Sequence, residues 1–122
     1  MQFVFADSEV AGIEVRGDTL HVRFAAAAVV DGPQGGDGYL AGLVLTLHGA
    51  RWQGDAAACF GRLVAGTLSD AVSRLSRIEL PFDGPGPWRA DLTFSHGRQL
   101  VVQARHVTAI PGAAPFQPSY AC

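Results

Sequence analysis

Residues 38–49, Gly-Tyr-Leu-Ala-Gly-Leu-Val-Leu-Thr-Leu-His-Gly, form the clearest apolar segment of the chain. Its second half alternates strictly between two sets of residues, Leu43, Leu45 and Leu47 against Val44, Thr46 and His48. A period of two predicts a β-strand with one aliphatic face and one mixed face. A segment of about a dozen residues is too short to cross a bilayer as a helix. We therefore expect residues 38–49 to form a central strand on which the other segments stack.

A first β-hairpin is predicted ahead of this segment. Apolar and polar residues alternate over 13–16 and over 20–24, with Gly17 and Asp18 between the two runs. Because both residues tolerate the positive φ of a tight turn, the Arg-Gly-Asp tripeptide here is interpreted as turn chemistry rather than as an adhesion motif. The alanine-rich run that follows is predicted to continue the second strand to Val30. The polar face of this hairpin carries Glu14, Arg16, His21 and Arg23.

A second hairpin is predicted near the end of the chain. Its strands cover residues 88–94 and 100–110, and its turn covers residues 95–98. In the later strand Leu100, Val102 and Ala104 share one face, while Val101, Gln103, Arg105 and Val107 share the other. Because both faces contain apolar residues, we expect this strand to be covered on both sides over part of its length.

The segments between the two hairpins contain shorter and less regular alternation. A strand over residues 77–80 is predicted to end at Pro81, and residues 82–87 are predicted to form a loop because proline cannot donate to a ladder. Residues 55–75 fit either a helical face or a strand over 62–68. We favour the strand, with another backbone passing close to Gly66, followed by one short helical turn near residues 69–75.

Together these patterns predict an all-β fold. Seven to eight short strands without βαβ alternation indicate a single-domain antiparallel β-sandwich or a partly open β-barrel. The domain is expected to cover residues 1–110. Residues 111–122 contain three of the seven prolines and are predicted to be an extended or loosely packed tail.

Composition restricts the classes of partner. The chain has 122 residues, a formal net charge of −2 and arginine as its only basic residue apart from histidine, with no basic stripe along the sequence. Nucleic acid is therefore a poor candidate partner. The first residues lack the pattern of a secretory signal, so we expect a cytoplasmic protein without a membrane role, and the arginine- and alanine-rich usage suggests a bacterial source. Cys59 is predicted to be a buried thiol.

No motif in the sequence predicts a specific reaction. His21, His48 and His106 fall in predicted strands, where imidazoles on neighbouring strands could converge, but their spacing matches no metal motif. His96 is interpreted as a solvated turn residue. The serines stand in no nucleophile motif, and Cys59 lacks an activating neighbour. We expect no cofactor and no bound metal. A metal-dependent or hydrolytic enzyme that uses the strand histidines remains the alternative to a binding protein.

Large aromatic residues outside the regular strands are the most suggestive feature. Trp52, Phe60, Phe82 and Trp88 lie in or beside predicted loops, where they either close the ends of the sheet or form a binding surface. Arginine next to tryptophan is typical of binding hot spots. The candidate residues for a ligand or partner site are therefore Arg51, Trp52, Phe82, Trp88 and Arg89.

These observations predict a protein that acts by binding a protein partner or a small ligand at a loop-rich end of the sheet. A two-fold homodimer is also expected, because an open sheet exposes unpaired strand edges and this chain has no lysine to protect them.

Overall fold

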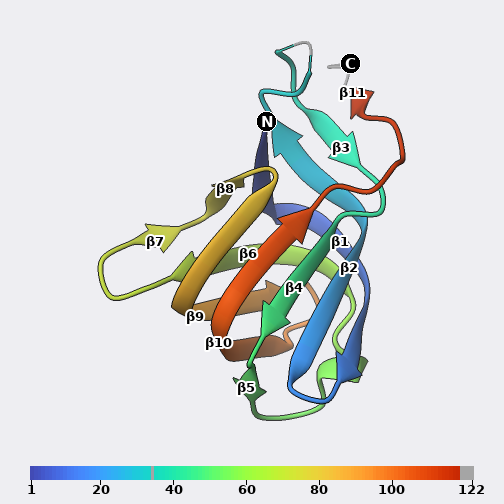
Figure 1. The fold of residues 1–122 in the computed structure, drawn as a ribbon. Helices are drawn as coiled ribbons and strands as arrows, with labels where there is room; N and C mark the ends of the chain where they lie inside the picture. The colour runs from blue at the N-terminus through green and yellow to red at the C-terminus, as the bar shows by residue number, and fades with distance from the viewer. Residues whose placement is uncertain (34, 119–122) are drawn as a thin grey trace.

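The computed structural model describes residues 1–33 and 35–118, and this part of the chain is all-β (Figure 1). The strands are β1 (Gln2–Arg16), β2 (Thr19–Val30), β3 (Gly38–Leu40), β4 (Val44–His48), β5 (Arg51–Trp52), β6 (Gly61–Ser69), β7 (Arg74–Leu75), β8 (Arg77–Glu79), β9 (Phe82–Phe94), β10 (Gln99–Ile110) and β11 (Gln117–Pro118). One 3-10 turn, Ala56–Ala58, lies between β5 and β6.

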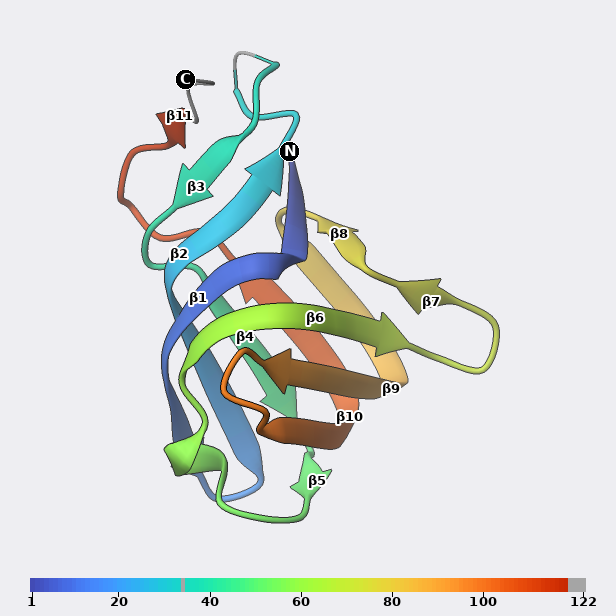
Figure 2. The ribbon, with the colours of Figure 1, turned by 180° about the vertical axis from the view of Figure 1, so that it is seen from behind.

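The long strands close into an antiparallel barrel. The order β2-β4-β10-β9-β6-β1 returns to its start because β1 also pairs with β2, which makes a closed barrel of six strands. Figure 2 shows β6 and β1 passing across the side opposite to β4. Short strands add to this barrel: β3 pairs with β2, β11 pairs with β3, and β8 pairs with β1. β7 pairs with the end of β6. The predicted antiparallel β fold is confirmed, in its barrel form.

Both predicted hairpins are present. The first pairs β1 with β2 and places Arg16 opposite Thr19 across the Gly17–Asp18 turn, where Gly17 has a φ of 61°. Glu14 forms ion pairs with Arg16 and Arg23 on the outer face of this hairpin. These hydrogen-bonded pairs lower the pKa of the Glu14 carboxyl.

The predicted central strand is split. β3 and β4 are separate strands because the chain bends at residues 41–43, where Gly42 has a φ of 79°. β4 lies between β2 and β10, and Leu43, Leu45 and Leu47 are fully buried, as the alternation predicts. Phe3, Phe5 and Phe24 form edge-to-face contacts within the same core.

The prediction that β10 is covered on both faces is wrong. Leu100, Val102 and Ala104 are buried, but Arg105 and His106 then both lie on the outer side, so Val107 returns to the core. The ladder between β10 and β9 shifts register at this point, which is a local bulge. Alternation in the sequence cannot show where a bulge shifts the pattern of inward and outward residues by one position.

The predicted loop at residues 82–87 is also wrong, because these residues begin β9. This half of β9 pairs with β10, whereas β6 pairs only with residues 89–94 of β9. Pro85 and Pro87 are tolerated because this part of the strand has a partner on one side, and proline in sheets is confined to edges and bulges. Phe82 consequently lies in a strand.

The strand over residues 62–68 is confirmed as part of β6, but the helical turn near residues 69–75 is not present. The carboxylate of Asp70 accepts hydrogen bonds from the backbone N–H groups of Val72 and Ser73, at 2.9 and 2.7 Å, and so forms a tight turn into β7. An aspartate that competes in this way for local N–H groups favours a turn over a helix. Gly66 allows the side chain of Phe5, rather than another backbone, to approach closely.

The tail after Ile110 is docked over the part that the structure describes. Gln117 pairs with Tyr39 in the β11–β3 ladder, and the ring of Phe116 lies against Gly32 and Gly38. A Cβ atom on Gly38 would lie 2.6 Å from that ring. Residues 119–122, including Cys122, lie outside the described part.

Candidate functional site

A row of polar side chains crosses the outer face of the barrel. Gln103 on β10 is directly opposite Arg51 on β5 and, on its other side, directly opposite Arg89 on β9. Arg89 is in turn opposite Ser69 on β6. Residues that are opposite one another in a ladder present their side chains on the same face, and neighbouring strands are about 4.8 Å apart. Arg51 and Arg89 therefore stand about two strand spacings apart, with Gln103 between them. All three are exposed.

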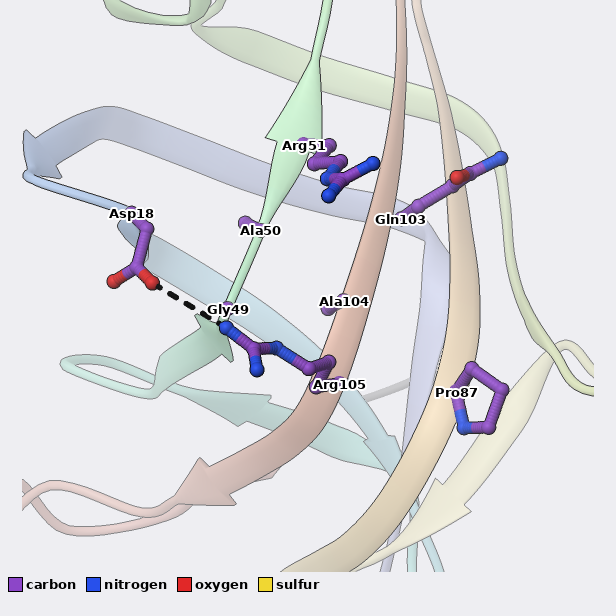
Figure 3. Close-up of a pocket in the computed structure, with 8 residues that line it drawn as sticks. All are labelled: Asp18, Gly49, Ala50, Arg51, Pro87, Gln103, Ala104 and Arg105. Atoms are coloured by element: carbon purple, nitrogen blue, oxygen red, sulfur yellow. Dashed lines mark ion pairs between the residues drawn. The ribbon is translucent and has the colours of Figure 1, made fainter.

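Three adjoining depressions surround Gln103. One of ≈ 500 Å³ includes Asp18, Arg51 and Arg105 (Figure 3). A second of ≈ 380 Å³ includes Arg51 and Trp52. A third of ≈ 390 Å³ includes Trp88 and Arg89. We call the surface formed by Arg51, Trp52, Trp88, Arg89, Gln103 and Arg105 the Gln103 face.

The largest depression lies where the sheet is interrupted beside Arg105. β4 ends at His48 and β5 begins at Arg51, so the ladder to β10 is broken at Gly49 and Ala50. Gly49 has a φ of 59°, and a Cβ atom there would lie 2.6 Å from Nε of Arg105. The glycine thus lets the arginine side chain cross the break toward Asp18, as Figure 3 shows.

The two tryptophans on this face are half-buried. Trp52 and Trp88 both pack against the hydrophobic core. The indole Nε1–H of Trp88 donates to the carbonyl of Gly84 at 2.9 Å, and the Trp88 ring contacts Phe82 edge to face, with ring centroids 5.9 Å apart. Trp52 is opposite buried Val102 and Trp88 is opposite buried Ala104, so both side chains start on the inner side of their strands, and only parts of them line the depressions.

The charges of this face are only loosely paired. Arg89 lies 3.7 Å from Asp91, and Arg105 lies 3.9 Å from Asp18, both at the outer limit for an ion pair. Arg51 has no ion-pair partner among the described residues. Exposed pairs of this length contribute little stability, so these guanidinium groups can change partners at small cost.

The structure brings together four of the five residues nominated from the sequence: Arg51, Trp52, Trp88 and Arg89. Phe82 lines none of the three depressions and instead supports Trp88. Gln103 and Arg105 also belong to this surface, although no pattern in the sequence nominated them. The predicted turn at residues 95–98 would pair residue 94 with residue 99 and place residue 103 opposite residue 90, whereas the ladder is shifted by one residue and places Gln103 opposite Arg89. The neighbouring position of Arg51 depends on the tertiary fold.

The strand histidines do not form one site with three imidazoles. His48 and His106 are opposite each other in the β4–β10 ladder, whereas His21 lies beside Thr46, with its Nδ1 3.4 Å from the Thr46 hydroxyl. Nε2 of His106 contacts Oδ1 of Asp83, and Nε2 of His48 lies 3.4 Å from the Thr108 hydroxyl. Base, carboxylate and hydroxyl are thus divided between two separate pairs rather than aligned as one catalytic triad.

His96 is exposed, as predicted, but it also links two loops. Its Nδ1 accepts from the backbone N–H of Arg98 at 3.3 Å, so its Nε2 carries the proton that is donated to the carbonyl of Phe60 at 2.8 Å. Its ring is stacked on buried Phe94. His96 therefore holds the segment before β6 against the β9–β10 turn.

The remaining reactive groups offer no centre of their own. No three His, Cys, Asp or Glu side chains within residues 1–33 and 35–118 are grouped closely enough to hold a metal ion. The thiol of Cys59 is buried, as predicted, and burial raises its pKa. No helix in the described part of the chain is long and apolar enough to span a bilayer.

Comparison of the chain with protein-family models, with curated proteins and with solved structures finds no match. The geometry of the Gln103 face is therefore the basis for assigning a function.

Proposed function

We propose that this protein is a binding module and that its Gln103 face docks a protein partner that presents carboxylate groups. The observation that carries the proposal is the row Arg51–Gln103–Arg89, in which two exposed arginines flank a glutamine across three neighbouring strands. The guanidinium group binds carboxylates through two parallel hydrogen bonds, and the amide of Gln103 can donate to or accept from a backbone between them.

The aromatic composition of the face supports the same proposal. Tryptophan and arginine dominate the hot spots of protein interfaces, where a rigid ring loses little conformational entropy on binding. Trp88 is already fixed by its hydrogen bond to Gly84. Trp52 and Trp88 lie one residue to either side of the row, so a partner seated on the row would also cover the exposed parts of both tryptophans.

The shape of the face favours a protein over a small molecule. Small ligands occupy concave sites that enclose most of their surface. Here the three depressions adjoin one another around Gln103 and together form a broad surface rather than one enclosed cavity. We further propose that the interaction takes place in the bacterial cytoplasm.

The proposal is tested by affinity capture from the native cell, followed by titration of each captured protein in purified form. The double variant Arg51→Ala/Arg89→Ala removes the row. Arg74→Ala/Arg77→Ala removes two exposed arginines from β7 and β8. Because its net charge equals that of the first double variant, it is the matched control. We expect the first variant to raise the Kd at least about tenfold and the control to change it less than about twofold.

Three results would contradict the proposal. The first is a captured partner whose Kd responds equally to the two double variants. The second is affinity that does not fall with rising salt, since a carboxylate–guanidinium interface must be screened. The third is a specific complex formed by this face only with a small molecule, which would move the protein to the ligand-binding class.

A further inference from the structure

A second side-chain cluster lies on the outer face of β4 and β10. His48 and His106 are directly opposite each other, with ring centroids 5.4 Å apart and planes inclined by 50°. Both imidazoles are half-buried, and the His106 side chain keeps 43% of its surface exposed. Two imidazoles held by a β-ladder at this separation are a pair of nitrogen ligands that solvent can reach.

One nitrogen of each ring is already engaged. Nε2 of His106 is hydrogen-bonded to Oδ1 of Asp83 on β9, and Nε2 of His48 lies beside the hydroxyl of Thr108. A histidine that binds a metal commonly donates its other ring N–H to a carboxylate or another oxygen, which fixes the tautomer and the orientation of the ring. In His106 the carboxylate partner of Nε2 leaves Nδ1 as the unprotonated nitrogen that can act as a ligand. The Thr108 hydroxyl can donate or accept, so its contact with Nε2 of His48 is compatible with the same tautomer.

We propose that His48 and His106 together bind a divalent transition-metal ion of the Cu²⁺, Ni²⁺ and Zn²⁺ class, with Asp83 as a positioning residue. A metal–nitrogen bond is about 2.0–2.1 Å long, so the centres of two imidazoles on one ion stand about 5–6 Å apart. The separation of the two rings already satisfies this condition. The chelate additionally requires rotations about the side-chain torsions that direct both Nδ1 atoms at one ion.

This site is an open chelate and not a closed metal centre. Asp83 is engaged by Nε2 of His106, and no group of three potential ligands exists among the described residues, so the proposed site has two protein ligands and water completes the coordination shell. A structural zinc site uses four protein ligands, and a catalytic one uses three. The site is therefore expected to bind metal reversibly. Its affinity should be higher for Cu²⁺ than for Ni²⁺ and Zn²⁺, which is the usual order for nitrogen ligands.

The test is isothermal titration of the untagged full chain with CuCl₂ and, separately, with ZnCl₂. The variants are His48→Gln and His106→Gln, and His21→Gln is the matched control because His21 is also a half-buried strand histidine with a threonine neighbour. We expect one ion per chain and at least a tenfold rise in Kd for either test variant. His21→Gln is expected to change the Kd less than twofold.

Asp83→Asn tests the positioning role. Loss of a carboxylate behind a metal-binding histidine weakens binding by about 10- to 100-fold. The Cu²⁺ spectrum adds a structural readout, because electron paramagnetic resonance counts the ligand nitrogens. Wild-type protein should show two coordinated imidazole nitrogens, and each histidine variant that remains folded should show one.

The proposal is overturned if no stoichiometric binding occurs at metal concentrations on the order of 100 µM, well above the micromolar range expected for a specific site. It is also overturned if His21→Gln weakens binding as much as His48→Gln. If a histidine variant unfolds, the nitrogen count of the wild-type Cu²⁺ complex decides alone, and a count below two contradicts the chelate. None of these results bears on the proposed function of the Gln103 face, because that face shares no residue with the His48–His106 pair.

Discussion

The Ser8 hydroxyl makes hydrogen bonds to two backbone groups at an irregular point of β1. Between Val4 and Glu9 the β1–β2 ladder shifts register, and Asp7 takes a φ of 67°. Ser8 is fully buried at this break. Its hydroxyl donates to the carbonyl of Val4 at 2.7 Å and accepts from the backbone N–H of Ala28 at 2.8 Å. The hydroxyl thus replaces the ladder bonds that the shift removes.

Ser8→Ala is therefore expected to lower the free energy of unfolding by about 1–3 kcal/mol, because it leaves two buried backbone groups without partners. Urea denaturation measures the loss. Ser73→Ala, in the exposed β6–β7 turn, is the control and should change stability by less than about 0.5 kcal/mol. Equal effects of the two substitutions would show that the Ser8 hydrogen bonds add nothing.

Truncation of the core leucines is expected to destabilise the protein more than Ser8→Ala does. Leu45 on β4 and Leu92 on β9 are both 0% exposed. Truncation to alanine is expected to cost about 2–5 kcal/mol at each position, from lost burial and the cavity left behind. Val72, which is 92% exposed, should tolerate alanine with little change. A loss below about 1 kcal/mol at either leucine would contradict its place in the core.

At the scale of single elements, β6 depends on a glycine. A Cβ atom on Gly66 would lie 2.6 Å from Cβ of Phe5 and 2.9 Å from its Cγ. Gly66→Ala should therefore destabilise the protein by about 1–3 kcal/mol through overpacking. Gly12→Ala on β1 has no atom within 4 Å and should be neutral or slightly stabilising. Thermal unfolding of the two variants gives the comparison, and a stable Gly66→Ala protein would refute the close contact.

The stability that the β6–β7 turn contributes should depend on pH, because it involves the carboxylate of Asp70. Hydrogen bonds from the backbone N–H groups of Val72 and Ser73 lower the pKa of the Asp70 carboxyl in the folded state. A group with a lowered folded pKa stabilises the fold above its unfolded pKa, and this stability is lost as the pH falls through the folded value. The difference in stability between wild type and Asp70→Ala should thus be constant near neutral pH and shrink below about pH 4. Denaturant titrations from pH 7 to pH 2 measure it, and a difference that grows in acid would contradict this role.

At the scale of the whole molecule, barrel closure changes the argument for self-association. The sheet ends at β8 and β11, of 3 and 2 residues, and the free edge of β9 contains Pro85 and Pro87. Short edges and prolines both oppose pairing between chains. A homodimer therefore has to form through side chains, and the exposed Phe60 and Val64 at the start of β6, at 58% and 54%, are the surface that we propose for it.

Sedimentation equilibrium at ~100 µM, well above the micromolar range of a specific dimer, tests this prediction. The Cys122→Ser variant is used so that oxidation cannot create a covalent dimer. We expect a dimer that Phe60→Ser/Val64→Ser converts to monomer, while Val15→Ser, at another exposed valine, does not. A monomer mass for the parent, or a dimer that survives the double substitution, would contradict the prediction.

Local patterns determined the all-β class, both hairpins and the burial of Leu43, Leu45 and Leu47, because a two-residue period and a Gly-Asp turn depend on neighbours in sequence. They also placed arginine beside tryptophan at residues 51–52 and 88–89. Only the tertiary structure brought Arg51 next to Gln103, and His48 next to His106, since such neighbours arise when β4 and β5 pair with β10. The same pairing makes a strand of proline-containing residues 82–87, and the β1–β2 ladder closes the barrel. Long-range ladders decide these features, and no local pattern encodes which distant strand becomes the partner.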